Sequence, residues 1–174
     1  MRDLAAKWSS VPDWRTATIA APGLAVRSLA GFSQYLVSGD LAAWAGSSGM
    51  EAKAVGALAS ASGARYALRV ARDRILAVSE APLDIEPGWH AHGFAVSACH
   101  AGLHMFEIEG EGLTALWTRA TAIDPHGTTP GAAIHFAGVN VFCCRHGRSD
   151  RLRIHVDRGL APYLWKWLER TSVS

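Results

Sequence analysis

The chain has 174 residues, of which 49% are hydrophobic and 18% are charged, and its formal net charge at pH 7 is +2. This length fits one domain or two small fused halves, and so apolar a composition excludes long disordered segments. A net charge so near zero argues against nucleic acid or a membrane surface as the partner.

The first part of the chain is predicted to form an arm and then strands and a short helix. Residues 1–16 are polar and are interrupted by Pro12, so we expect an N-terminal arm. β-prone residues fill 17–37, and Asp40 is placed to cap the helix that follows. The alternating segment 66–78 contains a central turn and predicts a hairpin.

A loop-rich segment at 81–92 contains two prolines and a glycine and is the best candidate for an internal joint. We therefore expect a single domain over residues 17–174, made of two halves, 17–80 and 93–170, that this segment connects.

Apolar periodicity is clearest in the second half. Residues 103–109 alternate as a strand, and two apolar strands are expected at 133–137 and 139–145. Between the strand at 103–109 and the strand at 133–137, apolar residues recur at the spacing of a helix that faces a core, namely Leu113, Leu116, Trp117 and Ala120. This mixture of helices and hairpins predicts an α+β fold with antiparallel sheets.

The end of the chain predicts a strand and a final helix. In residues 151–156 we expect Leu152, Ile154 and Val156 to point inward and Arg151, Arg153 and His155 to point outward. Asp157 is expected to cap the helix, whose buried stripe is predicted to be Leu160, Tyr163, Leu164, Trp167 and Leu168.

The two halves also resemble each other. The segment 35–39, which ends in glycine and precedes a helix, matches 106–110 in pattern, and a hairpin follows each helix, at 66–78 and at 139–156. This order predicts an internal duplication. A closing helix has no counterpart in the first half.

No motif of catalysis stands out. Histidines at 90, 92, 100 and 104, with Cys99, could hold a metal, but their spacing matches no known zinc framework, so loop and surface histidines are the preferred interpretation. Cys143 and Cys144 are adjacent, so on a strand we expect one buried and one exposed. We expect no catalytic, cofactor-binding or metal-binding residue in this chain.

Three cysteines give no disulfide framework, which fits a reducing compartment. The first eight residues lack the apolar core of a secretory signal, and no stretch approaches the roughly 18 apolar residues of a membrane span. We therefore expect a cytoplasmic protein that does not bind a membrane.

Arginines gather at the two hairpins, at 65, 69, 72 and 74 and again at 145, 148, 151 and 153. They could form an anion site, but a solvated sheet face is the preferred interpretation, because the near-zero net charge supplies no supporting field.

Trp165 is the most informative anomaly, because it lies off the predicted stripe of the last helix. Such a ring is either covered by a neighbouring segment or part of an interface. Trp and Arg are enriched in interface cores, so we expect Trp165, together with Arg158 and Lys166, to meet a partner.

The stretch from Phe94 to Arg170 resembles a known family. The most specific part is the ending Arg153-Ile154-His155-Val156-Asp157-Arg158, followed by Tyr163-Leu164-Trp165-Lys166-Trp167-Leu168. With Ala98-Cys99-His100 and the run 105–110, it looks like the gamma subunit of heterotetrameric sarcosine oxidase. That family is similar in fold to the folate-binding domain of the glycine-cleavage aminomethyltransferases, which implies two ferredoxin-like halves.

The resemblance implies a non-catalytic small subunit that supports assembly of a complex oxidising sarcosine. The implied partners are larger alpha and beta subunits that carry flavin and a small delta subunit. FAD, FMN, NAD and tetrahydrofolate would belong to the assembled complex and not to this chain. In the aminomethyltransferases, acidic residues lead into the strand that here runs from 141 to 145, and Val139 and Asn140 take that place. A folate there would lack its obvious proton-transfer group.

Two alternatives remain open at the level of sequence. The chain could be the equivalent subunit of an N-methylglutamate dehydrogenase. It could also be a stand-alone protein that binds folate or a small anion through its arginine-bearing hairpins.

Overall fold

A computed structural model describes residues 11–50 and 53–172 of the chain. The first ten residues of the expected arm lie outside the described residues. Among those described, no helix is long and apolar enough to cross a membrane.

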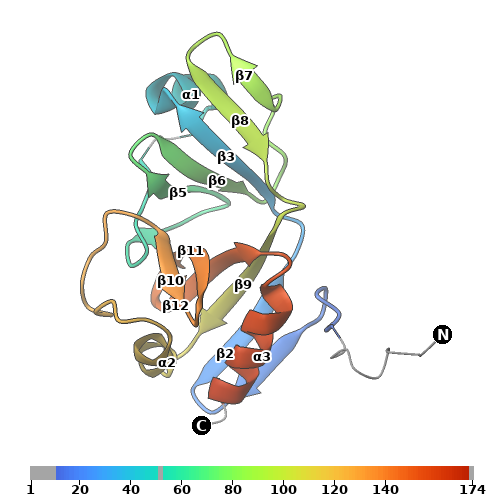
Figure 1. Ribbon diagram of the computed structural model, residues 1–174, viewed down its shortest axis with the longest axis vertical. Coiled ribbons are helices and arrows are strands. Elements are labelled where there is room, and N and C mark those ends of the chain that lie inside the picture. The colour runs from blue at the N-terminus through green and yellow to red at the C-terminus, as the bar shows by residue number, and fades with distance from the viewer. Residues whose placement is uncertain (1–10, 51–52, 173–174) are drawn as a thin grey trace, which may run out of the picture.

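The strands form two sheets, and all pairings between neighbours but one are antiparallel (Figure 1). The seven-stranded sheet has the order β1-β2-β9-β12-β11-β10, with β4 pairing in parallel with β11. Its strands are β1 (Thr18–Ala21), β2 (Leu24–Leu29), β4 (Ser60–Ala61), β9 (Leu103–Glu109), β10 (Ala133–Phe136), β11 (Val139–His146) and β12 (Arg148–Asp157).

The five-stranded sheet has the order β5-β6-β3-β8-β7. Its strands are β3 (Ser33–Gly39), β5 (Arg65–Ala71), β6 (Arg74–Ser79), β7 (Gly88–His90) and β8 (Phe94–Ala98). The expected α+β fold with antiparallel sheets and packed helices is confirmed.

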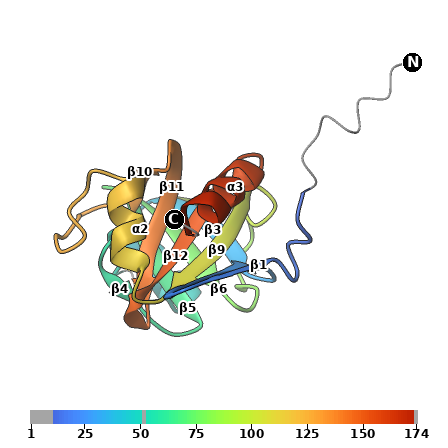
Figure 2. The ribbon, with the colours of Figure 1, turned by 90° about the horizontal axis from the view of Figure 1, so that it is seen from below.

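Three helices within the described residues cover the outer faces of the two sheets: α1 (Leu41–Ser48), α2 (Leu113–Ala120) and α3 (Ala161–Ser172). In Figure 1, α1 lies at the end of the molecule formed by the five-stranded sheet, and α2 and α3 lie at the opposite end. Figure 2 shows α2 and α3 across the face of the seven-stranded sheet. The inner faces of the sheets pack against each other and form a shared layer.

The element order supports the internal duplication. In the five-stranded sheet β3 lies between β6 and β8, and in the seven-stranded sheet β9 lies between β12 and β2. The run β5-β6-β3-β8 thus matches the run β11-β12-β9-β2, and a helix follows β3 as another follows β9. As expected, α3 has no counterpart in residues 80–87, between β6 and β7.

Two glycines mark equivalent points in the duplicated units. Gly39 ends β3 and Gly110 follows β9, with φ of 102° and 125°. A Cβ on Gly39 would lie 2.4 Å from the carbonyl oxygen of Gly93, and one on Gly110 would lie 2.3 Å from that of Gly23. Only glycine tolerates both the positive φ and the close approach of the neighbouring backbone.

Sheet membership cuts across the two expected halves. β1 and β2 belong to the sheet that contains β9 to β12, and β7 and β8 belong to the sheet that contains β3. The segment 81–92, expected as a joint, contains β7. The division of the chain into domains stays a prediction.

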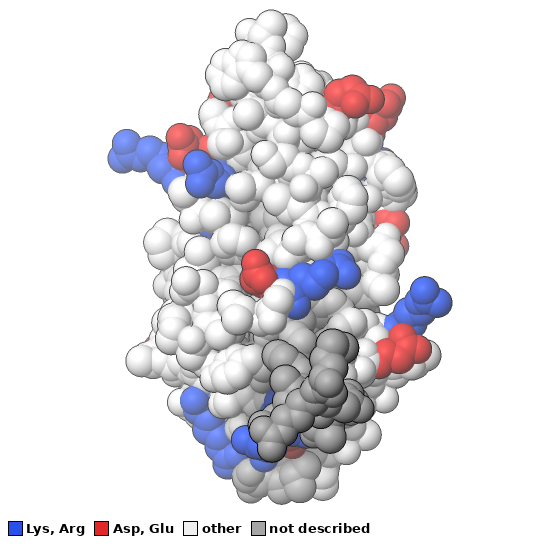
Figure 3. Space-filling model, turned by 45° about the vertical axis from the view of Figure 1, so that its right-hand side comes forward, with Lys and Arg blue, Asp and Glu red and all other residues white. Residues whose placement is uncertain are grey.

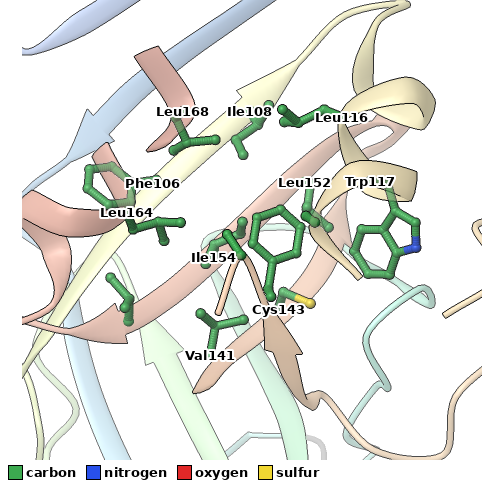
Figure 4. Packing of buried hydrophobic residues seen from close by; sticks show 14 of the residues in the cluster. Phe106, Ile108, Leu116, Trp117, Val141, Cys143, Leu152, Ile154, Leu164 and Leu168 are labelled. Carbon is green, nitrogen blue, oxygen red and sulfur yellow. The ribbon is translucent and has the colours of Figure 1, made fainter. Parts of the chain in front are cut away.

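The largest apolar cluster lies between the seven-stranded sheet and its two helices (Figure 4). The predicted stripe of α2 is confirmed, because Leu113, Leu116, Trp117 and Ala120 are all buried there.

At the end of the molecule formed by the five-stranded sheet, Asp40 caps α1 as predicted. Its Oδ1 accepts hydrogen bonds from the amides of Ala42 and Ala43 at 3.0 and 2.9 Å.

The prediction that Arg153 and His155 point into solvent is wrong, because both are buried. Only one of the adjacent cysteines was expected to be buried, yet Cys143 and Cys144 both are. The physical reason is common to the four residues. β11 and β12 have helices on one face and the second sheet on the other, so neither face meets water.

Candidate functional site

The face of α3 that contacts the core differs from the predicted one. The buried residues are Ala161, Leu164, Trp165 and Leu168, whereas Leu160 and Tyr163 are 41% and 50% exposed. Asp157 accepts a hydrogen bond from the Gly159 amide at 2.8 Å and so forms a turn before the helix rather than its cap. The helix therefore begins later than predicted and presents a neighbouring stripe.

Trp165 is only 4% exposed, so a neighbouring segment covers its ring; whether it also meets a partner stays a prediction. Its ring centroid lies 5.5 Å from that of Phe106 and 5.7 Å from that of Trp14. Its indole nitrogen donates to Glu169 Oε1 at 3.0 Å. Trp14, near the start of the chain, thus covers Trp165, which lies outside the stripe that the helical pattern predicted to be buried.

Arg158 and Lys166 are exposed, as expected of interface residues. Arg158 donates to the carbonyl oxygen of His100 at 3.0 Å, and Lys166 pairs with Glu169 at 3.1 Å. Whether these two side chains meet a partner stays a prediction.

The densest polar cluster lies between the two sheets, around Glu107 on β9. This carboxylate is fully buried. Its Oε2 accepts from Arg153 Nε at 2.8 Å and its Oε1 accepts from Arg27 Nε at 2.9 Å. Arg151 Nε lies 3.8 Å from Oε1 and pairs with Glu109 at 2.9 Å. Neighbouring strands β2, β9 and β12 thus place three arginines around two glutamates.

Hydrogen bonding has a larger effect than burial on the pKa of Glu107. Burial alone would raise the pKa of Glu107, but the hydrogen bonds from Arg153 and Arg27 more than compensate, and the pKa is lowered. Arg153 Nη1 is buried without a hydrogen-bond acceptor. Its guanidinium carbon lies 5.2 Å from the ring centroid of Phe32 and 5.5 Å from that of Tyr66, so the rings partly replace the missing acceptor.

His155 extends the polar cluster toward the five-stranded sheet. Its Nδ1 lies 2.6 Å from Gln34 Oε1 and its Nε2 lies 3.4 Å from the Tyr66 hydroxyl. Burial, with the nearby charge of Arg153, lowers the pKa of His155 to about 3, so the ring is neutral near pH 7. A neutral ring that faces a carbonyl oxygen must donate from Nδ1, which assigns the tautomer.

A second neutral histidine links the sheet to the segment before β1. Ser28 donates to the carbonyl oxygen of Trp14 at 2.6 Å, so its oxygen accepts from His104 Nε2 at 3.0 Å. Burial and the charge of Arg158 lower the pKa of His104 to about 4. Both histidines therefore serve as hydrogen-bonding structural residues at neutral pH.

The cysteines and the other histidines form no cluster. Burial raises the pKa of the Cys144 thiol to about 12 and holds that of Cys143 well above its ordinary value. Such thiols are protonated and poorly nucleophilic. Within residues 11–50 and 53–172, no three His, Cys, Asp or Glu side chains are placed to share a metal ion. His90 instead stacks on Phe94 with ring centroids 4.5 Å apart.

The second arginine group does not form a solvated face as a whole, which corrects the preferred interpretation. Arg153 is buried, and Arg145 donates to the carbonyl oxygen of Pro125 at 2.9 Å. Arg148 pairs with Asp150. Arg145 also lines a pocket of about 270 Å³ beside α2, with His126 and Asp150 among its other walls. The carboxylate of Asp150 in the pocket wall would repel a bound anion, so this pocket is a poor candidate for an anion site.

One exposed aromatic was missed by sequence reasoning. Trp89 on β7 is 73% exposed, the highest fraction of any large hydrophobic side chain in the described chain. Two sequence signals could have identified it. Trp89 lies within a segment rich in proline and glycine, and residues 75–118 contain no lysine or arginine.

No family model and no curated protein matches the sequence. The fold is similar to that of a chain of the heterotetrameric sarcosine oxidase from Corynebacterium sp. U-96, in a structure of that enzyme in complex with pyrrole 2-carboxylate. The TM-score is 0.68 at 19% sequence identity, and the match covers 88% of this chain and 86% of that chain. At this identity the likeness shows a shared fold, which confirms the resemblance inferred from the sequence at that level.

Proposed function

We propose that this chain is the small, non-catalytic gamma subunit of a heterotetrameric flavoenzyme of the sarcosine oxidase type. The observation that carries the proposal is the extent of the structural likeness, since it spans 88% of this chain and 86% of the matched chain. A resemblance over both chains favours an equivalent subunit over a shared module inside an unrelated protein.

The use of the buried polar groups supports a structural role. Glu107 is enclosed by Arg27 and Arg153, and His155 and His104 are held neutral by burial and hydrogen-bonded within the chain. A catalytic acid or base must reach a substrate with a pKa near the working pH. These groups instead connect strands to one another, as the core of a scaffold requires.

The proposal extends to the partners and cofactors that the resemblance implied. Larger alpha and beta subunits would carry FAD and FMN and use NAD and tetrahydrofolate, and a small delta subunit would complete the complex. The substrate would be sarcosine, with the N-methylglutamate dehydrogenases as the closest alternative. Location in the cytoplasm, and binding of folate or an anion by the isolated chain, stay predictions.

Purification from the native host tests this function. A tagged copy of this chain should co-elute with larger flavin-bearing chains, identified by mass spectrometry and flavin absorbance. The eluate should oxidise sarcosine, and deletion of this gene should lower that activity until the wild-type chain is restored. The proposal fails if the chain elutes without flavoproteins, or if the isolated chain turns over an N-methyl amino acid. Saturable binding of tetrahydrofolate to the lone chain would favour the stand-alone alternative.

A further inference from the structure

Trp89 is the most exposed large apolar side chain of the described residues, and it lies where a partner can reach it. Its strand, β7, is the outermost strand of the five-stranded sheet and pairs only with β8. The opposite edge strand, β5, is covered, because Val55 and Ala132 form backbone hydrogen bonds with it. β7 is therefore the open edge of this sheet within the described chain.

The exposed ring is held on an anchored hairpin. His90, the next residue, stacks on the fully buried Phe94, and its Nε2 lies 2.8 Å from the carbonyl oxygen of Glu86. Leu83 is buried against the α1 side of the sheet and fixes the preceding loop. A ring whose neighbours are already ordered loses little conformational entropy when it binds.

The surface around this hairpin is acidic. Leu83 and Ile85 pack inward, so the residues that alternate with them, Asp84 and Glu86, are exposed. No lysine or arginine of the described chain forms an ion pair with either of the two. In Figure 3, the acidic groups toward the upper right of the molecule have no basic group beside them. We call residues 80–93 the hairpin end.

The negative charge of the hairpin end indicates which kind of partner can bind there. A membrane with anionic headgroups or a nucleic acid would be repelled. A second copy bound through the same patch would place like charges opposite each other. A protein surface with an apolar pocket and basic residues at its rim fits both features, since Trp and Arg are the residues enriched in interface cores and a cation can also lie over the indole.

We propose that the hairpin end is the surface through which this chain docks on a larger subunit of its complex, with Trp89 in an apolar pocket rimmed by lysine or arginine. This inference rests on the proposed function and adds to it the place of contact and the chemistry of the partner. The contact surface is thus at the opposite end of the molecule from α3, the helix that includes Lys166.

The test uses the complex obtained from the native host, rebuilt with variants of this chain. Trp89→Ala should weaken the affinity for the larger subunits by about 30-fold, as expected for a central tryptophan anchor. The double variant Asp84→Lys with Glu86→Lys should slow association, and added salt should slow association of the wild type. Leu160→Ala, at an exposed position in the turn directly before α3, is the matched control and should change affinity less than about threefold.

Each outcome decides. Assembly of Trp89→Ala with wild-type affinity overturns the docking surface while leaving the proposed function intact. Failure of the wild type to bind any flavoprotein overturns both. A larger loss in Leu160→Ala than in Trp89→Ala moves the contact to α3 and overturns the inference. A homodimer of the wild type that Trp89→Ala dissociates also overturns it. Circular dichroism of Trp89→Ala must match the wild type, because a misfolded variant would contradict the exposure of the ring.

Discussion

The layer between the two sheets and the hairpin end use polar residues in opposite ways. In the layer, Glu107, Arg153 and His155 are buried and are hydrogen-bonded within the chain. At the hairpin end, Asp84 and Glu86 are exposed beside Trp89, and no described basic side chain pairs with them. The first region holds the fold together, and the second is available for binding.

The contrast teaches that conspicuous residues are poor guides to function until their surroundings are known. Trp165 and Trp89 are both tryptophans outside any obvious apolar stripe. Trp165 is enclosed by Trp14 and Phe106, whereas Trp89 has no such cover among the described residues. Packing by a distant segment, rather than local pattern, separates the structural residue from the one that can bind.

Replacing each tryptophan by alanine should give the largest difference between the two regions. Trp165→Ala removes a buried ring and should lower the free energy of unfolding by about 3–5 kcal/mol, because it leaves a cavity. Trp89→Ala should change it by less than about 0.5 kcal/mol. Urea unfolding of the isolated variants, followed by circular dichroism, measures both. Equal losses would mean that the two rings are equally buried and would remove the contrast.

Glu107→Gln tests the polar layer itself. The substitution leaves the buried guanidinium of Arg153 without its counter-charge and should lower the free energy of unfolding by about 3 kcal/mol. Glu109→Gln is the control, because that carboxylate is partly exposed, and it should cost less than about 1 kcal/mol. A loss for Glu107→Gln as small as for the control would show that the cluster is not a source of stability.

The neutral histidines predict how stability depends on pH. The folded pKa values of His155 and His104, about 3 and about 4, lie below the unfolded value near 6.5, so the unfolded chain binds more protons between these limits. Each histidine should lower the free energy of unfolding by about 2 kcal/mol as the pH falls from about 7 to about 5.

The variant His155→Gln separates this contribution. It should remove about half of the loss between those two pH values, whereas the exposed His126→Gln should leave the loss unchanged. Denaturant unfolding at a series of pH values gives the slopes. A slope that His155→Gln does not reduce would mean that the ring is not held neutral in the folded chain.

Local pattern was enough to predict much of the fold. The stripe of α2, the cap of α1 and the duplicated order of strands, helix and hairpin depend on neighbours a few residues apart. These features are set by periodicity and by short-range hydrogen bonds, which a sequence displays directly.

What the sequence did not predict depends on distant packing. Apolar and polar residues alternate along β12, a pattern typical of a strand with one solvent-exposed face. The second sheet nevertheless covers that face and buries Arg153 and His155. The stripe of α3 was placed one position away, because Trp14 from the start of the chain covers Trp165. Trp89 lies in a three-residue strand that begins at Gly88, directly after Pro87, and this strand is too short to show a periodic pattern.

Hydrogen–deuterium exchange of this chain, alone and within the purified complex, tests the central claim most directly. The open edge and exposed loop of residues 80–93 should exchange quickly in the lone chain and more slowly after assembly. Residues 161–172 of α3 should exchange at the same rate in both states. Protection confined to 161–172, or none in 80–93, would contradict the claim that this chain is a scaffold subunit that docks through its hairpin end.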